Sequence, residues 1–204
     1  RRRQPLAGRP PACHVGPMDD RLSLYNARHT TAAARRDALA ARAARLANVR
    51  FLAFATAIGA LVWAELRPEI GGLAFTLFAL SLLAFFALIV VHGRVRDDER
   101  RTAELASVNA EAAARLRRDW DALPAQPDRA PPGHAYAHDL DVFGHGSLLA
   151  LLGTTGTGVG RARLRGWLLA PAPVDELESR QGAVRDLVDR LEFRQDFQVA
   201  GRLA

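Results

Sequence analysis

The chain has 204 residues, enough for one or two domains, and a formal net charge of +6 with a pI of about 10.9. Its single cysteine, Cys13, excludes an internal disulfide and fits a reducing compartment. All of its strongly basic residues are arginines. The absence of lysine excludes a phosphate loop of the G-x-x-x-x-G-K-[ST] type within these residues.

Residues 1–17 carry much of the basic excess. They read RRRQPLAGRPPACHVGP, show no hydrophobic periodicity and precede the only methionine, Met18. Their four arginines come before the first acid, so the rest of the chain carries only +2. We expect a disordered basic extension or a mis-assigned gene start; a basic arm that touches anionic lipid or nucleic acid is the functional alternative. A secretory signal does not fit, because the first long apolar run begins near Phe51.

Two apolar stretches follow a helix-forming segment rich in Ala and Arg, Ser23–Arg50. The uncharged run Phe51–Ala64, with its flanks, predicts a first membrane span at about 50–66. Pro68 and two glycines then break the helix. Gly71–Val91 has no charged residue and as a helix reaches about 30 Å, enough for a second span. The alternatives are a re-entrant or interfacial segment for the first stretch and a buried helix of a soluble protein for the second.

The distribution of arginines predicts the orientation of this hairpin. Many arginines lie on the two arms beyond the apolar stretches: Arg28, Arg35, Arg36, Arg42, Arg45, Arg50, Arg94, Arg96, Arg100 and Arg101. The connection between the stretches has only Arg67, beside two glutamates. The positive-inside rule therefore predicts a multi-pass protein of the inner (cell) membrane, with both termini cytoplasmic and the connection outside.

A helical pattern without Gly or Pro resumes at Val95–Leu123. It is nearly as long as the helix before the first span, so we expect the hairpin to continue into the cytoplasm as a loose antiparallel pair; two separate solvated helices are the alternative. Pro124–Gly133 has four prolines in ten residues, which predicts an extended, semi-rigid linker. The predicted units are therefore a membrane hairpin (18–123), a linker (124–133) and a second helical unit (134–204).

Short helices are predicted in the second unit, which makes the whole chain all-α. Ser147 suits an N-cap for a helix over Leu148–Leu152. A second helix over Gly160–Leu169 ends before two prolines. A last helix runs from Val174 or Asp175 through Leu191. Its apolar residues are predicted to face inward: Leu177, Val184, Leu187 and Leu191.

A set of residues with regular spacing marks roughly 40 positions of this unit: Leu148, Leu152, Thr155, Thr157, Gly160, Leu164, Trp167, Leu168, Pro171, Arg180, Gln181, Ala183 and Val184. The spacing resembles the start of the core (lever) domain of the MutS family of DNA mismatch repair ATPases. That pattern runs L-x-x-x-L-D-x-T-x-T-x-x-G-x-R-x-L-x-x-W-L-x-x-P, followed by R-Q-x-A-V. The chain departs from it at Gly153, where the family has Asp, and at Ala162, where it has Arg. With the hairpin, the block from His134 is similar to a membrane-associated MutS-like subfamily that has two N-terminal spans.

The resemblance implies that the chain is the N-terminal part of a membrane-anchored, MutS-like ATPase. It implies ATP and Mg for the full-length protein, a homodimer formed through an ATPase domain that these residues lack, and DNA as a partner. It does not imply mismatch recognition, because no Phe-x-Glu mismatch-reading element is recognisable. The family-motif residues are expected to pack and cap helices: Thr155, Thr157, Gly160, Leu164, Trp167, Pro171, Arg180 and Gln181. No catalytic, cofactor-binding or metal-binding residue is predicted.

Two other patterns invite a chemical interpretation. Gly153–Gly160 is rich in Gly and Thr but lacks the lysine of a phosphate loop. Three histidines and two aspartates follow the linker without metal-ligand spacing, so solvated loop histidines are expected: His134, His138, His145, Asp139 and Asp141. The alternative function is a membrane-anchored helical scaffold or sensor without a nucleic-acid role.

Overall fold

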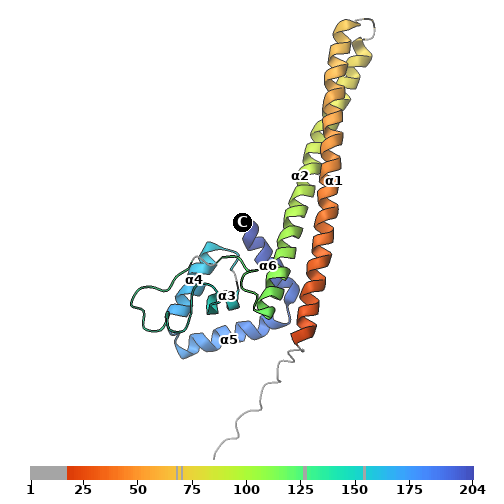
Figure 1. The fold of residues 1–204 in the computed structure, drawn as a ribbon. Helices are drawn as coiled ribbons and strands as arrows, with labels where there is room; N and C mark the ends of the chain where they lie inside the picture. Colours follow the sequence, from red (N-terminus) through yellow and green to blue (C-terminus); the bar gives the residue numbers. More distant parts are fainter. Residues whose placement is uncertain (1–17, 68, 70, 126–127, 154) are drawn as a thin grey trace, which may run out of the picture.

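The computed structural model describes residues 18–67, 69, 71–125, 128–153 and 155–204. Within these residues the fold is all helical, with six α-helices and no strand, which confirms the predicted class. Two long helices form a hairpin, and four shorter helices gather at the end of the hairpin away from its connection (Figure 1). The predicted extension 1–17, Pro68, the linker positions 126–127 and Thr154 lie outside the described residues.

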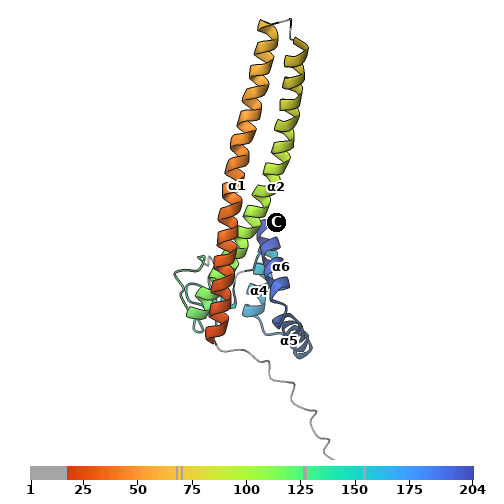
Figure 2. The same cartoon turned by 90° about the vertical axis from the view of Figure 1, so that its right-hand side faces the viewer.

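The hairpin consists of α1 (Met18–Leu66) and α2 (Gly71–Arg117). Each predicted span and the predicted cytoplasmic helix next to it form one continuous helix, about 70 Å long. The two helices run side by side over their length, as Figures 1 and 2 show. The predicted antiparallel pair therefore exists, and the alternative of two separate helices is wrong.

Helix α2 ends at Arg117, although the pattern predicted helix through Leu123. Arg118 adopts a left-handed backbone conformation with a φ of 56°. The Asp119 amide donates to the Ala114 carbonyl at 3.0 Å, and the Arg118 amide donates to the Arg115 carbonyl at 3.1 Å. These two bonds form a Schellman motif, which satisfies carbonyls that the helix would otherwise leave open.

The seam between α1 and α2 is lined by alanines. Buried alanines come from both helices: Ala32, Ala43, Ala57, Ala60, Ala74, Ala106, Ala113 and Ala114. Many large side chains of the apolar part of the hairpin point outward instead, with Phe51 72% exposed and Leu83 67% exposed. Both helices are long and apolar enough to cross a membrane, and only 11% of the most apolar part of each is buried. A core helix of a soluble protein is mostly buried, so this distribution fits an apolar surrounding better.

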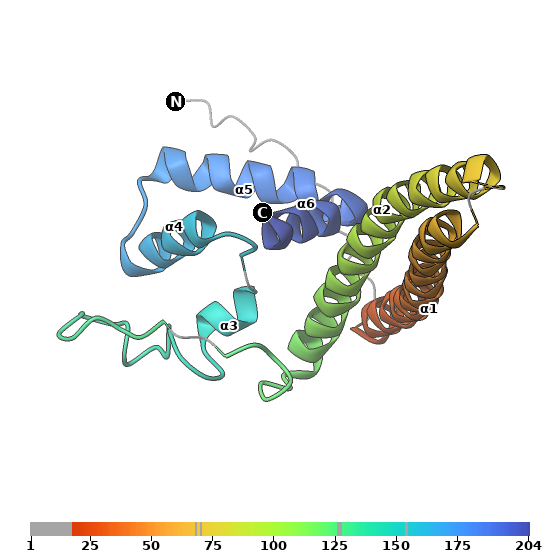
Figure 3. The ribbon, with the colours of Figure 1, turned by 90° about the horizontal axis from the view of Figure 1, so that it is seen from above.

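The head consists of α3 (Leu148–Leu152), α4 (Gly158–Leu169), α5 (Val174–Val188) and α6 (Leu191–Leu203), with the loop that precedes them. Helix α6 packs on α2, and α5 packs on α6. Seen from above, the head lies on the α2 side of the hairpin (Figure 3).

The predicted last helix is wrong at its C-terminal end. Helix α5 stops at Val188, and α6 is a separate helix that begins at Leu191. The break lies at Arg190, whose ψ of 54° is not helical. No residue of α5 is buried, so the predicted inward positions Leu177 and Val184 are exposed.

The segment 124–133 contains no helix among its described residues. Asp128 accepts a hydrogen bond from the Arg165 guanidinium of α4 at 3.2 Å, so this position lies against the head. The predicted spacer role of the segment stays a prediction.

Replacing Ala57 by Leu should destabilise the hairpin. Ala57 is 2% exposed in the seam, and extra methylenes there force the helices apart at a cost of about 2 kcal/mol. Thermal unfolding of the protein in detergent, followed by circular dichroism, would show a lower midpoint. The matched control is Ala55→Leu, because Ala55 is exposed two residues away. Equal midpoints for the two variants would contradict the packed seam.

Candidate functional site

The most polar part of the interior lies where α6 meets the hairpin. Asn109 of α2 is fully buried, and its side-chain oxygen accepts a hydrogen bond from Gln195 Nε2 at 2.7 Å. Asn109 Nδ2 donates to the Leu105 carbonyl at 2.8 Å. The Arg28 guanidinium of α1 donates to Gln195 Oε1 at 3.0 Å and to Glu192 at 2.8 Å. One chain of hydrogen bonds therefore joins α1, α2 and α6.

A second cluster holds the C-terminal half of α6. Arg202 donates to Glu111 Oε2 at 2.7 Å, and Arg115 donates to the same oxygen at 2.9 Å. Ser107 donates to the other Glu111 oxygen at 3.2 Å. Arg115 also donates to the Ala150 carbonyl of α3 at 3.3 Å. Glu111 is therefore the point at which α2, α3 and α6 are tied together.

The pKa of Glu111 is lowered from its ordinary value of 4.5. Burial is the largest influence and by itself would raise this pKa, but the hydrogen bonds and positive charges of Arg202 and Arg115 together outweigh it. The pKa of Arg202 is raised: burial acts against the charged form, and the carboxylate of Glu111 more than offsets it. The carboxylate thus stays ionised and paired, which suits a structural tie and not a general base.

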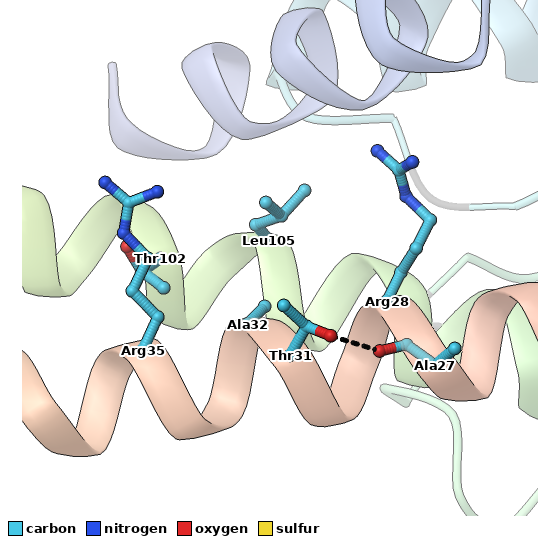
Figure 4. A pocket seen from close by; sticks show the side chains of 7 residues that line it. All are labelled: Ala27, Arg28, Thr31, Ala32, Arg35, Thr102 and Leu105. Atoms are coloured by element: carbon cyan, nitrogen blue, oxygen red, sulfur yellow. Dashed lines mark hydrogen bonds between the residues drawn. The ribbon is translucent and has the colours of Figure 1, made fainter.

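A groove runs beside this junction, between α1 and α2 on the side that faces α6 (Figure 4). Its volume is about 310 Å³, and its floor is formed by Ala27, Ala32 and Leu105. The side chains of Arg28 and Arg35 extend from α1 toward α6. Next to it, Arg101 of α2 pairs with Asp196 of α6 at 3.0 Å. The groove has small apolar walls and charged edges, and Arg28 at one edge bonds to α6.

The first predicted motif residues lie in the tight connection between α3 and α4. Thr157 is the N-cap of α4, and its hydroxyl accepts a hydrogen bond from the Gly160 amide at 3.1 Å. A Cβ on Gly160 would lie 3.1 Å from that hydroxyl and 3.3 Å from Thr155 Cβ, so a side chain there would press on both threonines. Thr155 donates to the Thr157 carbonyl at 3.4 Å. These residues shape the connection.

Gly156, between them, lies close against the backbone of α6. A Cβ there would lie 2.9 Å from the Gln198 carbonyl of α6. A shallow pocket of about 400 Å³ lies beside this contact and is lined mostly by glycine, threonine and apolar atoms of α6. The Gly–Thr connection is therefore a packing surface for α6.

The remaining motif residues lie farther along. The Arg180 guanidinium of α5 stacks over the Trp167 ring of α4 at 4.0 Å and also pairs with Glu176. Leu164 is half-buried in α4. Pro171 and Gln181 are exposed. The structure thus brings Trp167 and Arg180 together, and it places Pro171 and Gln181 at the surface.

His134 is not a solvated loop residue, contrary to the prediction. Its Nε2 donates to the Leu169 carbonyl at 3.0 Å, and its Nδ1 accepts from the Ala137 amide at 3.3 Å. Tyr136 donates to the neighbouring Leu168 carbonyl at 3.1 Å. Both side chains therefore satisfy open carbonyls at the end of α4. The other two histidines, His138 and His145, are exposed as predicted.

Sequence reasoning missed the residues that dock α6: Asn109, Glu111, Gln195 and Arg202. Their one visible signal was Asn109, a polar residue four positions after Leu105 beside the apolar stripe of a helix rich in alanine. No group of three or more His, Cys, Asp or Glu residues that could hold a metal ion occurs in the part of the chain that the structure describes. No protein-family model, curated protein or solved structure matches the chain.

Replacing Gly156 by Ala should loosen α6, because the new methyl group would press on the Gln198 carbonyl. The backbone must shift, so we expect a loss of about 1–3 kcal/mol in stability. Gly158→Ala is the matched control: nothing lies within 4 Å of its added Cβ, and Ala favours the first turn of α4. Thermal unfolding of both variants should lower the midpoint for the first and leave it unchanged or raised for the second. The reverse order would rule out the packed connection.

The docking of α6 should weaken at acid pH. Because the pKa of Glu111 is lowered in the folded state, its contribution is complete above about pH 4.5 and disappears as the pH falls through the folded value. The Glu111→Gln variant should therefore show faster amide hydrogen exchange in α6 than the unchanged protein at pH 7. The difference in exchange rate between the two proteins should become smaller below pH 4.5. The control is Glu178→Gln, at an exposed position of α5. A difference that is constant with pH would show that the Glu111 charge does not hold α6.

Proposed function

We propose that this chain is a membrane-anchored helical scaffold. The hairpin crosses a bilayer with its apolar part, and its polar part carries the head on the cytoplasmic side. The observation that carries the proposal is the arrangement of side chains: alanines fill the seam, and large apolar residues cover the outside of the hairpin near its connection. In lipid, the hydrophobic effect does not drive two helices together. A pair of membrane-spanning helices therefore needs small residues that allow the helices to approach closely.

The proposed orientation places the connection outside and both termini in the cytoplasm. Arginines lie on the arms beyond the apolar part, whereas the connection holds Arg67 beside Glu65 and Glu69. Trp63, 45% exposed near the connection, lies where an interfacial aromatic residue is favoured.

The proposed scaffold holds its head at a set distance from the membrane. Glu111 lies 20 residues beyond Val91, which is about 30 Å along a continuous helix. Because Glu111 and Asn109 bond directly to α6, the head is tied to the hairpin and does not hang from a flexible chain.

A second candidate function is the N-terminal part of a membrane-anchored, MutS-like ATPase. Its support is the residue pattern from Leu148 to Val184, whose threonines and glycines shape the connection before α4. The described residues offer neither a lysine nor a cluster of carboxylates for ATP and Mg, so we assign no nucleotide step to them. ATP binding, the homodimer and DNA binding would depend on residues beyond these.

One experiment separates the two candidates: sequencing the reading frame past the codon for Ala204. A frame that continues into a G-x-x-x-x-G-K-[ST] loop would support the ATPase. A stop codon directly after the codon for Ala204 would contradict the ATPase candidate. DNA binding that weakens steeply as salt rises, measured on the whole encoded protein, would add support for a nucleic-acid role.

The topology predicts which sites a membrane-impermeant maleimide can reach. In a Cys13→Ser background, a cysteine at Glu69 should be labelled on intact spheroplasts. A cysteine at Val184, exposed on α5, should be labelled only after the membrane is opened. Alkaline carbonate should leave the protein in the membrane fraction. Labelling of both sites on intact spheroplasts, or release by carbonate, would contradict the proposed hairpin.

A further inference from the structure

Four arginines form a band around the hairpin where its apolar part ends. The arginine band consists of Arg42, Arg45 and Arg50 of α1 and Arg94 of α2. Helix α1 has no acid between Asp37 and Glu65, and α2 has none before Asp97. No carboxylate therefore interrupts the band along α1 from Arg42 to Arg50 or along α2 up to Arg94.

The position of the band matches the headgroup layer of a bilayer. Arg50 directly precedes the apolar run that begins at Phe51, and Arg94 follows Val91 by three residues. From Arg50 to Arg42 the band extends about 12 Å along the helix. The polar layer on each side of a bilayer is roughly 5–8 Å thick, and long arginine side chains reach several Å farther along the helix toward it.

The band keeps its charges available. Arg42, Arg50 and Arg94 have no ion pair or side-chain hydrogen bond within the part of the chain that the structure describes, and Arg45 donates only to the Ala41 carbonyl at 3.4 Å. Three of the four are exposed, and Arg50 is half-buried.

Several arginines of the hairpin nearer the head are paired. Such pairs join Arg36 with Asp37, Arg96 with Glu99, and Arg101 with Asp196. At the level of the lipid headgroups, phosphate groups could supply partners for the four arginines of the band.

We propose that the arginine band binds the headgroups of anionic phospholipids in the cytoplasmic leaflet. The inference rests on the proposed membrane anchor and names its lipid partner. Each arginine near an anionic surface strengthens the attraction about fivefold, so four act together strongly. Nucleic acid is the less suitable partner, because a bilayer that covers the apolar part would crowd this level of the hairpin.

The test is lipid competition on the purified chain in detergent, read by native mass spectrometry. With equimolar phosphatidylglycerol and phosphatidylcholine, the unchanged protein should retain phosphatidylglycerol at least about tenfold better. A variant in which all four arginines of the band, Arg42, Arg45, Arg50 and Arg94, are replaced by Gln should lose most of that preference. A variant in which the same four arginines are replaced by Lys should keep most of the preference for phosphatidylglycerol, because a lysine also supplies a positive charge to phosphate.

A matched control changes four exposed arginines of the head region to Gln: Arg117, Arg129, Arg163 and Arg185. It removes the same total charge and should keep the lipid preference. No preference in the unchanged protein, or an equal loss in the control, would overturn the proposal. The proposal would also be overturned if the unchanged protein bound a short DNA duplex, and the Gln variant of the band lost this binding but kept the lipid preference.

Failure of the lipid proposal can be told from failure of the anchor. A chain that resists alkaline carbonate but shows no preference for phosphatidylglycerol overturns only the lipid proposal. A chain that carbonate releases from membranes overturns both.

Discussion

The close approach of α1 and α2 along an alanine seam is the constraint on which the rest of the structure depends. Ala57, Ala60 and Ala74 give the pair a narrow contact that buries little area, so the seam cannot also hide the large side chains. Phe51, Leu80 and Leu83 remain outside. These side chains are exposed in the fold, and the charge-free length of α2 is enough to cross a bilayer.

The polar end of the hairpin holds the small head in place, although the head buries little apolar surface of its own. Helix α5 buries no residue, and α6 buries only Gln195 and Val199. Docking therefore relies on hydrogen bonds and ion pairs, above all those of Asn109 and Glu111. Removing one partner of such a cluster leaves a buried charge or amide unsatisfied, so these contacts specify a single position for α6. A tie of this kind suits a scaffold that has to present its head in one orientation.

Local patterns predicted the hairpin well and the head less well. The charge-free run Gly71–Val91 and the Ala–Arg helix before Phe51 determine their helices by composition alone. The α6 junction could not be predicted, because Gln195 and Asn109 are 86 residues apart and neither belongs to a periodic pattern. Apolar spacing in α5 suggested a buried face at Val184, yet among the described residues no element covers it. Of the motif residues, Thr157 was predictable as a helix cap, whereas the stacking of Arg180 on Trp167 depends on how α4 and α5 pack.

The most direct test of the membrane-spanning hairpin is the depth of α2 in a bilayer. Spin labels at exposed positions of α2, Leu73, Leu80 and Val90, would be placed one at a time on the chain in liposomes. Their collision rates with oxygen and with a water-soluble nickel chelate would then be compared. For a hairpin that spans the bilayer, oxygen access should be highest and nickel access lowest at Leu80, with both trends weaker at Leu73 and Val90. Equal nickel access at all three positions would show that the hairpin does not span the membrane.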